Sequence, residues 1–382
     1  LVLKGSFGLS PKERQLRSAL IGVQYVASFG LIIGATFMYL QNYYMQNTPL
    51  GYDKDEIIIT NMNNNIRKSR DAFASQVKSF SGIEEVTYAE MLLSSQDQYM
   101  GWGRKYRDKD IQFQCLPVEP SFLKVMNVKI SEGRDFREED KAKRYGTFVF
   151  NERARTEYGL EIGSLIDSME IVGFMPDVKF ASFRTEVTPM AFFVWGTNNW
   201  GNQPNYAYIK VKAGSDLRGA MQHVKTTLQS FDPEYPFNVR FFDEVLNGLY
   251  EKERSLSSLI TLFSLIAIFI SVVGVFGLVV FDSEYRKKEI GIRKVLGSTT
   301  EEIIVMFNKT YIRILCVCFV LGAPIAGYVV HRWLENFAYK TPMYWWVYLI
   351  AFAIIAVITI LTVTFQNWRA ANENPVHSIK NE

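Results

Sequence analysis

The chain has 382 residues, 48% of them hydrophobic and 14% aromatic, and its formal net charge is +3. This composition excludes an intrinsically disordered protein, which would have low hydrophobicity and few aromatic residues. Residues 51–254 carry 27 Lys+Arg against 30 Asp+Glu, so the one large polar segment is slightly acidic and argues against nucleic-acid binding.

The segment before the first apolar stretch predicts a short amphipathic helix at the membrane surface. In "LSPKERQLRSAL", Ser10 is a candidate N-cap, Pro11 stands at the first helical position, and Glu13 completes a capping box. We therefore expect an entry helix within residues 1–18.

Four stretches almost free of charge predict membrane helices. Residues 18–52, 255–281 and 341–368 contain no charged residue, and Arg313 alone interrupts 310–331. Each stretch reaches the roughly 20 apolar residues needed to cross about 30 Å of hydrocarbon. The first is expected to be a retained span rather than a signal peptide, because tyrosines follow it in place of a small-residue cleavage site.

The polar segment between the first and second spans predicts a two-lobed α/β domain. Short runs rich in β-branched and aromatic residues predict strands at 56–60, 84–90, 111–118, 147–150, 170–175, 190–195, 206–212 and 237–242. Helical periodicity is found at 67–80, 120–126, 152–158 and 216–231. The Gly- and Asn-rich "WGTNNWGNQPN" at 195–205 predicts a long turn or a lobe boundary.

A long helix is predicted between this domain and the cytoplasmic side. Residues 243–254 have a helical pattern and run without proline into the second span. If the helix is continuous to Tyr285, its roughly 42 residues make a rod about 60 Å long.

A strongly basic segment, "RKKEIGIRKVLGST", follows the second span at 286–299. Glu289 and Arg293 form a supporting i,i+4 pair beside a narrow apolar stripe, which predicts a short amphipathic helix. One interpretation of this basic segment is an orientation signal that lies on anionic lipid headgroups. The other interpretation is a helix that docks a cytoplasmic partner protein.

The end of that segment predicts a turn and a new helix. Gly297 can end the short helix in the left-handed conformation. The next helix, which enters the third span, can be capped in two ways, by Ser298 with Glu301 or by Thr299 with Glu302.

The distribution of Lys and Arg orients the chain. Basic residues gather before the first span, between the second and third, and after the fourth. By the positive-inside rule both termini and the basic loop are cytoplasmic, and the α/β domain is extracytoplasmic.

The predicted fold class is a four-helix membrane protein with a two-lobed α/β extracytoplasmic domain inserted between helices one and two. Its expected parts are an entry helix at 1–18, spans at 19–44, 303–332 and 344–368, the α/β domain at 45–242, a stalk with the second span at 243–285, a coupling loop at 286–302, a short outer loop at 333–343 and a cytoplasmic tail at 369–382.

The sequence offers no catalytic, cofactor-binding or metal site. Phosphate-binding, nucleophile-elbow and metalloprotease motifs are missing, and His223, His331 and His377 fall in separate parts of the chain. Of the three cysteines, only Cys115 is in the α/β domain, so no disulfide framework is expected. We expect a protein that is not an enzyme.

At these motifs the sequence resembles the FtsX-like and MacB-like permeases of ABC transporters. The segment "RKKEIGIRKVLGST" is similar to their cytoplasmic loop, which has an R-x-x-E-I-G-x-R-[KR]-x-[LI]-G pattern after the second of four spans. The tail "AANENPVHSIKNE" is similar to the family's terminal motif. In the α/β domain, "SEGRDF" (131–136) and "IVGFMPDVKF" (171–180) resemble signatures of the MacB-like periplasmic core.

The resemblance implies a non-catalytic permease subunit in the bacterial inner membrane. For this chain it implies that a separate cytoplasmic ABC ATPase binds and hydrolyses ATP and drives movement of the extracytoplasmic domain, which is called mechanotransmission in this family. This departs from MacB proper, which carries its ATPase on the same chain. A second permease half or copy and membrane lipids are the other implied partners, and no cofactor is bound by the chain itself. The residues implied to dock the ATPase are Arg286, Lys287, Glu289, Ile290, Arg293, Lys294, Leu296 and Gly297.

The resemblance leaves the substrate open. Lipoprotein extraction, peptide or drug efflux, and control of cell-wall hydrolases would all use this architecture. The opening "LVLKGSFGLSPKERQLRSALIGVQYVAS" resembles the middle of two-repeat permeases of Bacteroidota, so we expect the C-terminal half of an eight-span chain. The alternative function is a membrane-bound sensor whose outer domain binds a ligand and whose loop recruits a signalling protein.

Overall fold

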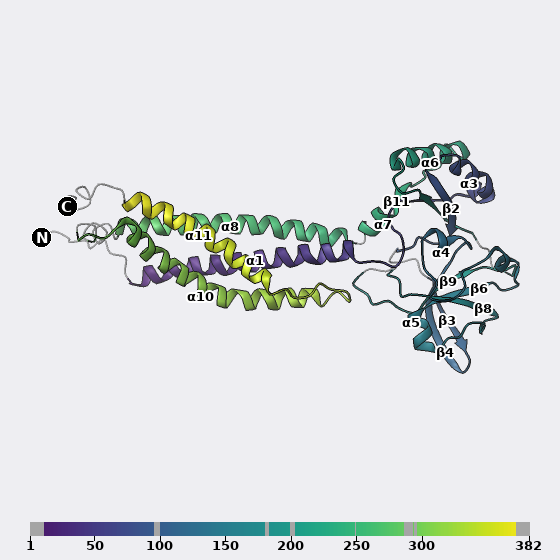
Figure 1. Ribbon diagram of the computed structural model, residues 1–382, viewed down its shortest axis with the longest axis horizontal. Helices are drawn as coiled ribbons and strands as arrows, with labels where there is room; N and C mark the ends of the chain where they lie inside the picture. Colours follow the sequence, from purple (N-terminus) through teal and green to yellow (C-terminus); the bar gives the residue numbers. More distant parts are fainter. Residues whose placement is uncertain are drawn as a thin grey trace. The chain divides into compact units, whose positions relative to one another are not determined.

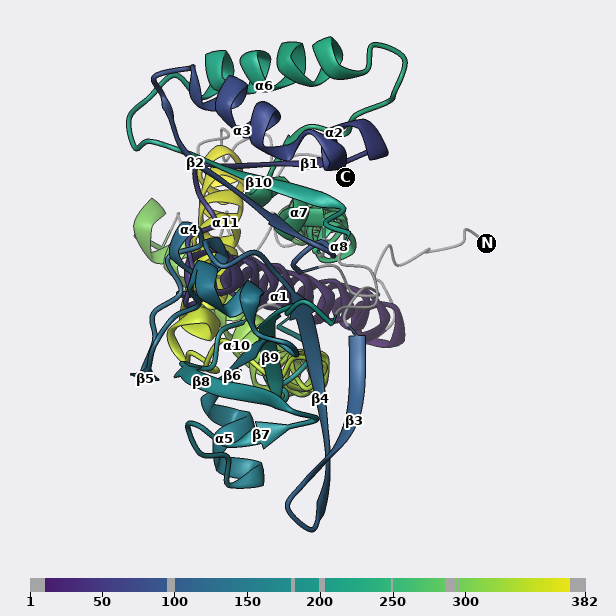
Figure 2. The same ribbon diagram turned by 90° about the vertical axis from the view of Figure 1, so that its right-hand side faces the viewer.

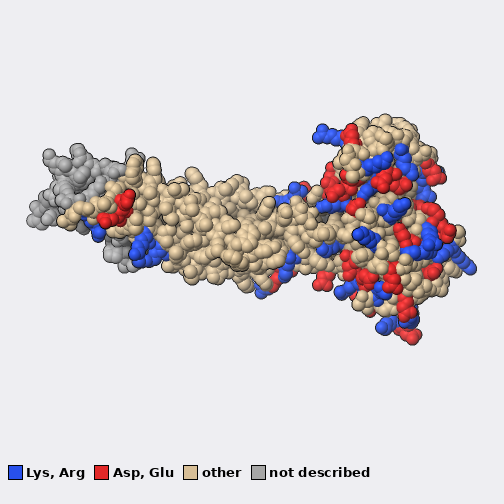
Figure 3. Space-filling view, viewed as in Figure 1, with Lys and Arg blue, Asp and Glu red and all other residues tan. Residues whose placement is uncertain are grey.

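The chain folds into two compact units. The computed structural model describes residues 11–94, 100–179, 183–198, 203–248, 250–285, 293 and 296–371. The helical unit consists of Leu1–Gln46, Glu253–Asn336 and Lys340–Glu382, and the α/β unit consists of Asn47–Lys252 and Phe337–Tyr339 (Figure 1). Charged side chains gather on the α/β unit, whereas the visible face of the helical unit has few (Figure 3).

Four long helices form the helical unit: α1 (Pro11–Asn47), α8 (Glu251–Tyr285), α10 (Thr300–Leu334) and α11 (Trp346–Ala371). Among the described residues, these are the helices long and apolar enough to cross a membrane, which confirms the predicted spans. Large apolar side chains such as Phe269 and Leu361 point outward, at 69% and 64% exposed, as suits helices surrounded by lipid. Helix α1 begins at Pro11 and continues to Asn47, so residues 11–47 are one helix rather than an entry helix and a span.

Small side chains let α1 approach α8 closely. The hydroxyl oxygens of Ser28 and Ser271 are 2.8 Å apart. A Cβ added at Gly274 would lie 2.4 Å from Oε1 of Gln24. In lipid, apolar burial contributes little to helix association, so such close packing and interhelical hydrogen bonds hold the pair together.

The first lobe of the α/β unit is an antiparallel sheet covered by helices. Its strand order is β11 (Arg240–Phe241), β1 (Ile57–Asn61), β10 (Tyr206–Val211) and β2 (Ile83–Ala89). The short α2 (Asn64–Lys68) and α3 (Arg70–Lys78) follow β1, and α6 (Leu217–Phe231) follows β10, which is a split β-α-β arrangement. Figure 2 shows α3 and α6 over the same face of this sheet, where their buried residues join the strands in one core.

The second lobe is a mixed sheet inserted between β2 and β10. Its strand order is β3 (Met100–Tyr106), β4 (Lys109–Pro117), β9 (Met190–Val194), β6 (Thr147–Asn151), β8 (Met169–Met175) and β5 (Glu132–Gly133), with β7 (Leu165–Ile166) paired to β8. The pairs β4–β9 and β6–β8 are parallel. The described helices of this lobe are α4 (Phe122–Val125), the 3₁₀ turn η1 (Glu138–Ala142) and α5 (Glu152–Tyr158).

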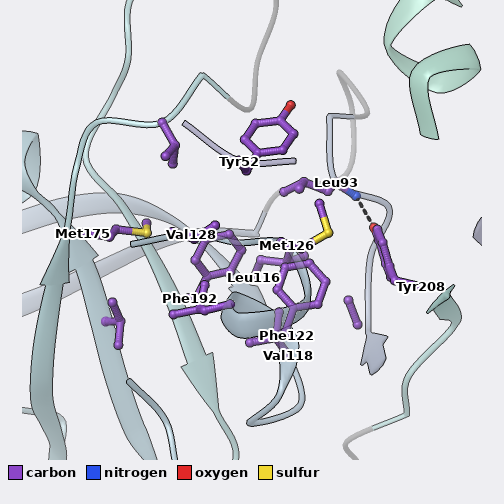
Figure 4. Packing of buried hydrophobic residues seen from close by; sticks show 14 of the residues in the cluster. Tyr52, Leu93, Leu116, Val118, Phe122, Met126, Val128, Met175, Phe192 and Tyr208 are labelled. Carbon is purple, nitrogen blue, oxygen red and sulfur yellow. Dashed lines mark hydrogen bonds between the residues drawn. The ribbon is translucent and has the colours of Figure 1, made fainter. Parts of the chain in front are cut away.

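One apolar core joins the two lobes (Figure 4). The ring of Phe122 is fully buried and meets Tyr208 of the first lobe edge-on, with centroids 5.1 Å apart, and Phe192 of the second lobe at 5.6 Å. The Tyr208 hydroxyl accepts the backbone N–H of Leu93 at 2.7 Å, which satisfies the one polar group that this ring brings into the core. The two predicted lobes are therefore confirmed, and they share buried residues.

The two motifs of the α/β unit prove to be structural. "SEGRDF" and "IVGFMPDVKF" pair with each other as β5 and β8. Gly133 has a φ of +81°, and a Cβ on Gly173 would lie 2.4 Å from the Arg134 carbonyl oxygen. The Arg134 guanidinium holds both carboxylate oxygens of Asp140 at 2.8 Å, and Asp140 is 1% exposed. These residues fix the edge of the second sheet.

Two predicted elements are corrected by the structure, and one strand is not predicted. Residues 243–254 are not one helix with the second span, because α7 (Phe242–Gly248) ends at Gly248 and α8 begins at Glu251. Glycine weakens a helix interior, and the Tyr250 hydroxyl accepts the Phe183 N–H. The strand predicted at 237–242 shrinks to β11. Strand β3, "MGWGRKY", is not predicted because its glycines and charges hide the strand pattern.

Candidate partner-docking loop

Part of the predicted docking loop is described. Arg286, Lys287, Glu289, Ile290 and Lys294 lie outside the described residues, whereas Arg293, Leu296 and Gly297 lie within them. Arg293 is exposed, and the Leu296 side chain is 80% exposed. A leucine this exposed is suited to contact with another molecule.

A glycine turn ends the basic segment. Gly297 has a φ of +97°, and the Ser298 N–H donates to the Arg293 carbonyl at 2.9 Å. A bond that spans five positions around a left-handed glycine is the Schellman motif, in which the residue without a Cβ takes a conformation that others avoid. The predicted glycine stop is confirmed.

The next helix starts at once. The Thr299 hydroxyl accepts the Glu302 N–H at 3.2 Å, and the Glu302 carboxylate accepts the Thr299 N–H at 3.1 Å. Of the two predicted capping boxes, this is the one that forms. The carboxylates of Glu301 and Glu302 lie in the first turn of α10, where they are favoured by the positive end of the helix dipole.

No group of three His, Cys, Asp or Glu among the described residues could hold a metal ion. His223 stacks on Phe80 in the α/β unit, with centroids 5.5 Å apart, and His331 pairs with Glu335 in the helical unit at 3.4 Å.

A second set of contacts, within the α/β unit, is not singled out by the sequence. Lys179 and residues 183–187 contact residues 50–52, Tyr250 and Phe337–Tyr339 through backbone bonds, ring packing and cations over rings. The available signals are two short runs, "FASFR" and "FAYK", each with aromatic and basic residues. Neither indicates the other, because pairing between them depends on the fold.

Two family models match the chain. The MacB-like periplasmic core domain matches residues 21–227, which is more than half of the chain, and the FtsX-like permease C-terminal region matches residues 261–375. The second match contains the glycine turn and the capping box. The first runs from α1 into α6 and contains the second lobe and most of the first, up to residue 227.

Curated relatives include the macrolide export ATP-binding/permease protein MacB of Chromobacterium violaceum, 23% identical over 230 residues, and that of Escherichia coli, 23% identical over 233 residues. Each match covers 57% of this chain and 35% of the relative, so the chain spans about a third of the length of these relatives. The crystal structure of the periplasmic region of MacB from Actinobacillus actinomycetemcomitans is 13% identical, with a TM-score of 0.39. That match covers 54% of this chain and 98% of the solved MacB chain.

Proposed function

Because this chain belongs to the FtsX/MacB-like family of ABC transporter permeases, we propose that it couples ATP hydrolysis by a separate cytoplasmic ATPase to conformational change of the α/β unit. It is an inner-membrane protein whose α/β unit lies outside the cytoplasm. The chain is the non-catalytic subunit, and the ATPase binds the nucleotide. A second permease half or copy and membrane lipids complete the proposed assembly.

The observation that carries this proposal is the capped turn between α8 and α10. A helix stop at Gly297 and a helix start at Thr299 lie next to each other, so the exposed Leu296 stands on backbone of defined geometry. A simple connecting loop would need neither device. A preorganised turn loses less conformational entropy on binding, which favours its use as a docking element.

Charged residues and the apolar side chain would contribute differently to docking. Basic residues of "RKKEIGIRKVLGST" steer the encounter with an acidic groove and set its orientation. Burial of one leucine side chain contributes about 1.5–3 kcal/mol, which is roughly a 10- to 150-fold gain in affinity. A push on the turn then acts directly on the first turn of α10, because Thr299 and Glu302 close its end.

Binding to the cognate ATPase in lipid nanodiscs tests this function. We expect Arg293→Glu/Lys294→Glu to abolish association and Leu296→Ala to weaken it by about tenfold. The matched control is Arg218→Glu/Lys225→Glu, which makes the same charge change on exposed residues of α6. The control should bind as the unchanged chain does.

Two outcomes would count against the proposal. Unchanged association of the reversed variant contradicts docking through this turn. An intact complex in which nucleotide leaves hydrogen exchange of the α/β unit unchanged contradicts coupling, and favours the sensor alternative.

A further inference from the structure

One segment of the α/β unit contacts every passage of the chain into the helical unit. We call Lys179 together with residues 183–187 the junction segment. The passages are residues 48–52 after α1, Tyr250 before α8, and Phe337–Tyr339 between α10 and α11. All of these residues belong to the α/β unit.

The first two passages are held by hydrogen bonds. The Lys179 N–H donates to the Leu50 carbonyl at 2.9 Å, and the Tyr52 hydroxyl donates to the Lys179 carbonyl at 3.4 Å. The Phe183 N–H donates to the Tyr250 hydroxyl at 2.9 Å, and their rings meet edge-on at 6.1 Å.

The third passage is held from both its backbone and its rings. The Tyr339 N–H donates to the Phe183 carbonyl at 3.1 Å, and the Val187 N–H donates to the Tyr339 hydroxyl at 3.3 Å. The two rings meet edge-on at 5.9 Å. The Lys179 ammonium lies 4.7 Å from the Tyr339 ring centroid and 5.3 Å from that of Phe183, which is cation–π geometry.

Burial supports a firm attachment. Phe183 and Phe337 are each 2% exposed, and the Arg184 guanidinium lies 5.1 Å from the Phe337 ring centroid. Burial lowers the pKa of Lys179 from its usual value. The two ring faces offset part of this desolvation cost, because a cation over a ring face is attracted to it.

The connection from the end of α10 to Phe337 is only two residues long. Helix α10 ends at Leu334, and only Glu335 and Asn336 precede Phe337. The N–H groups of both still donate to carbonyls of α10, at His331 and Trp333. Phe337 therefore follows the last hydrogen-bonded turn of α10 directly in the chain.

We propose that Phe337–Tyr339 is an anchor through which α10 moves the α/β unit, so that coupling has a second route beside α8. This route runs from the turn at Gly297, along the continuous α10, into the anchor and the junction segment. It rests on the proposed function, and it assigns Tyr339 and Lys179 as the residues that position the anchor. The junction segment is then the point at which displacements of α1, α8 and α10 enter the α/β unit.

The attachment itself is tested on the full chain in nanodiscs without ATPase or nucleotide. Amide hydrogen exchange at residues 183–187 should accelerate by about tenfold in Tyr339→Ala, because the variant loses the ring that packs on Phe183 and the hydroxyl that accepts the Val187 N–H. Tyr339→Phe should accelerate exchange at Val187 alone, since it loses only the hydroxyl.

Trp345→Ala is the matched control, because it removes a large aromatic residue that is 72% exposed in the same connection between α10 and α11. Exchange across β10 reports intact folding. Equal exchange in the Tyr339→Ala variant and the unchanged chain would overturn the anchor.

The route is tested with the ATPase bound. Spin labels at Lys225→Cys and Trp368→Cys, with the exposed Cys316 replaced by Ser, report on the α/β unit and the helical unit. The unchanged chain and Trp345→Ala should show a nucleotide-dependent change in the label distance, and Tyr339→Ala should lose most of that change. A full change in the Tyr339→Ala variant would overturn the second route. If the unchanged chain shows no change although the ATPase is bound, the proposed function fails, whereas the exchange experiment still decides whether the anchor exists.

Discussion

Replacement of Gly297 isolates the conformation of the docking turn from its contacts. Gly297 has a φ of +97°, and a Cβ added there would meet no atom within 4 Å among the described residues. Alanine therefore introduces no clash, and its whole effect is the energy of a left-handed backbone, about 1–2 kcal/mol. That energy lowers the population of the docking-competent turn by roughly 5- to 30-fold.

The assay is equilibrium binding of the full chain in nanodiscs to its ATPase. We expect Gly297→Ala to weaken binding by roughly 5- to 30-fold, and Gly297→Asn to weaken it less, because asparagine enters the left-handed region more readily. Gly34→Ala is the control, since a Cβ there also meets no atom within 4 Å. Gly34 lies inside α1, where alanine is the better helix former by about 0.5–1 kcal/mol.

The ranking of the variants decides the matter. If Gly297→Ala binds as tightly as the unchanged chain, the glycine turn is not the docking conformation. If Asn and Ala weaken binding equally, backbone handedness is not the cause. A loss of binding in Gly34→Ala would show that the assay reports general damage to the chain.

Three further predictions concern stability and packing. Burial alone would raise the pKa of Asp140, but the Arg134 guanidinium and the Arg137 N–H outweigh burial and lower that pKa. The Asp140 carboxylate therefore contributes fully to stability above about pH 4, and this contribution is lost as pH falls further. Asp140→Ala should lower the urea unfolding free energy of the α/β unit by about 3 kcal/mol at neutral pH, and a gap that stays constant down to about pH 2 would contradict the ion pair. Phe122→Ala should cost about 3–5 kcal/mol in the same unfolding measured by pulse proteolysis, and a loss below about 1 kcal/mol would mean that the lobes do not share this core. Ser28→Cys/Ser271→Cys should cross-link α1 to α8 on mild oxidation, because the two hydroxyl oxygens are 2.8 Å apart; protection of both thiols from oxidation would contradict this helix packing.

Several features of the site could be predicted because their causes are local. The glycine stop at Gly297 and a capping box after it depend on residues within a few positions of one another. The choice between the two boxes could not be predicted, since Ser298 with Glu301 satisfies the same spacing as Thr299 with Glu302. The actual cap depends on where the chain leaves the turn.

The junction segment could not be predicted at all. Val187 and Tyr339 are 152 positions apart, and neither residue type indicates such a partner. The end of α7 at Gly248 and the new start of α8 at Glu251 have the same origin, because the Tyr250 hydroxyl accepts the Phe183 N–H, 67 positions away. Helical pattern alone favours one continuous rod there.

The sequence by itself determined the four spans, the α/β class of the unit between them and the turn that ends the basic segment. Each follows from run length, periodicity or capping chemistry, which act over at most about 20 neighbouring residues. Only the tertiary structure decided that the two lobes share a core, that α1 packs on α8, and that three passages of the chain meet at Lys179 and residues 183–187. Those contacts join residues far apart in the chain, and they form only when all the packed elements are in place.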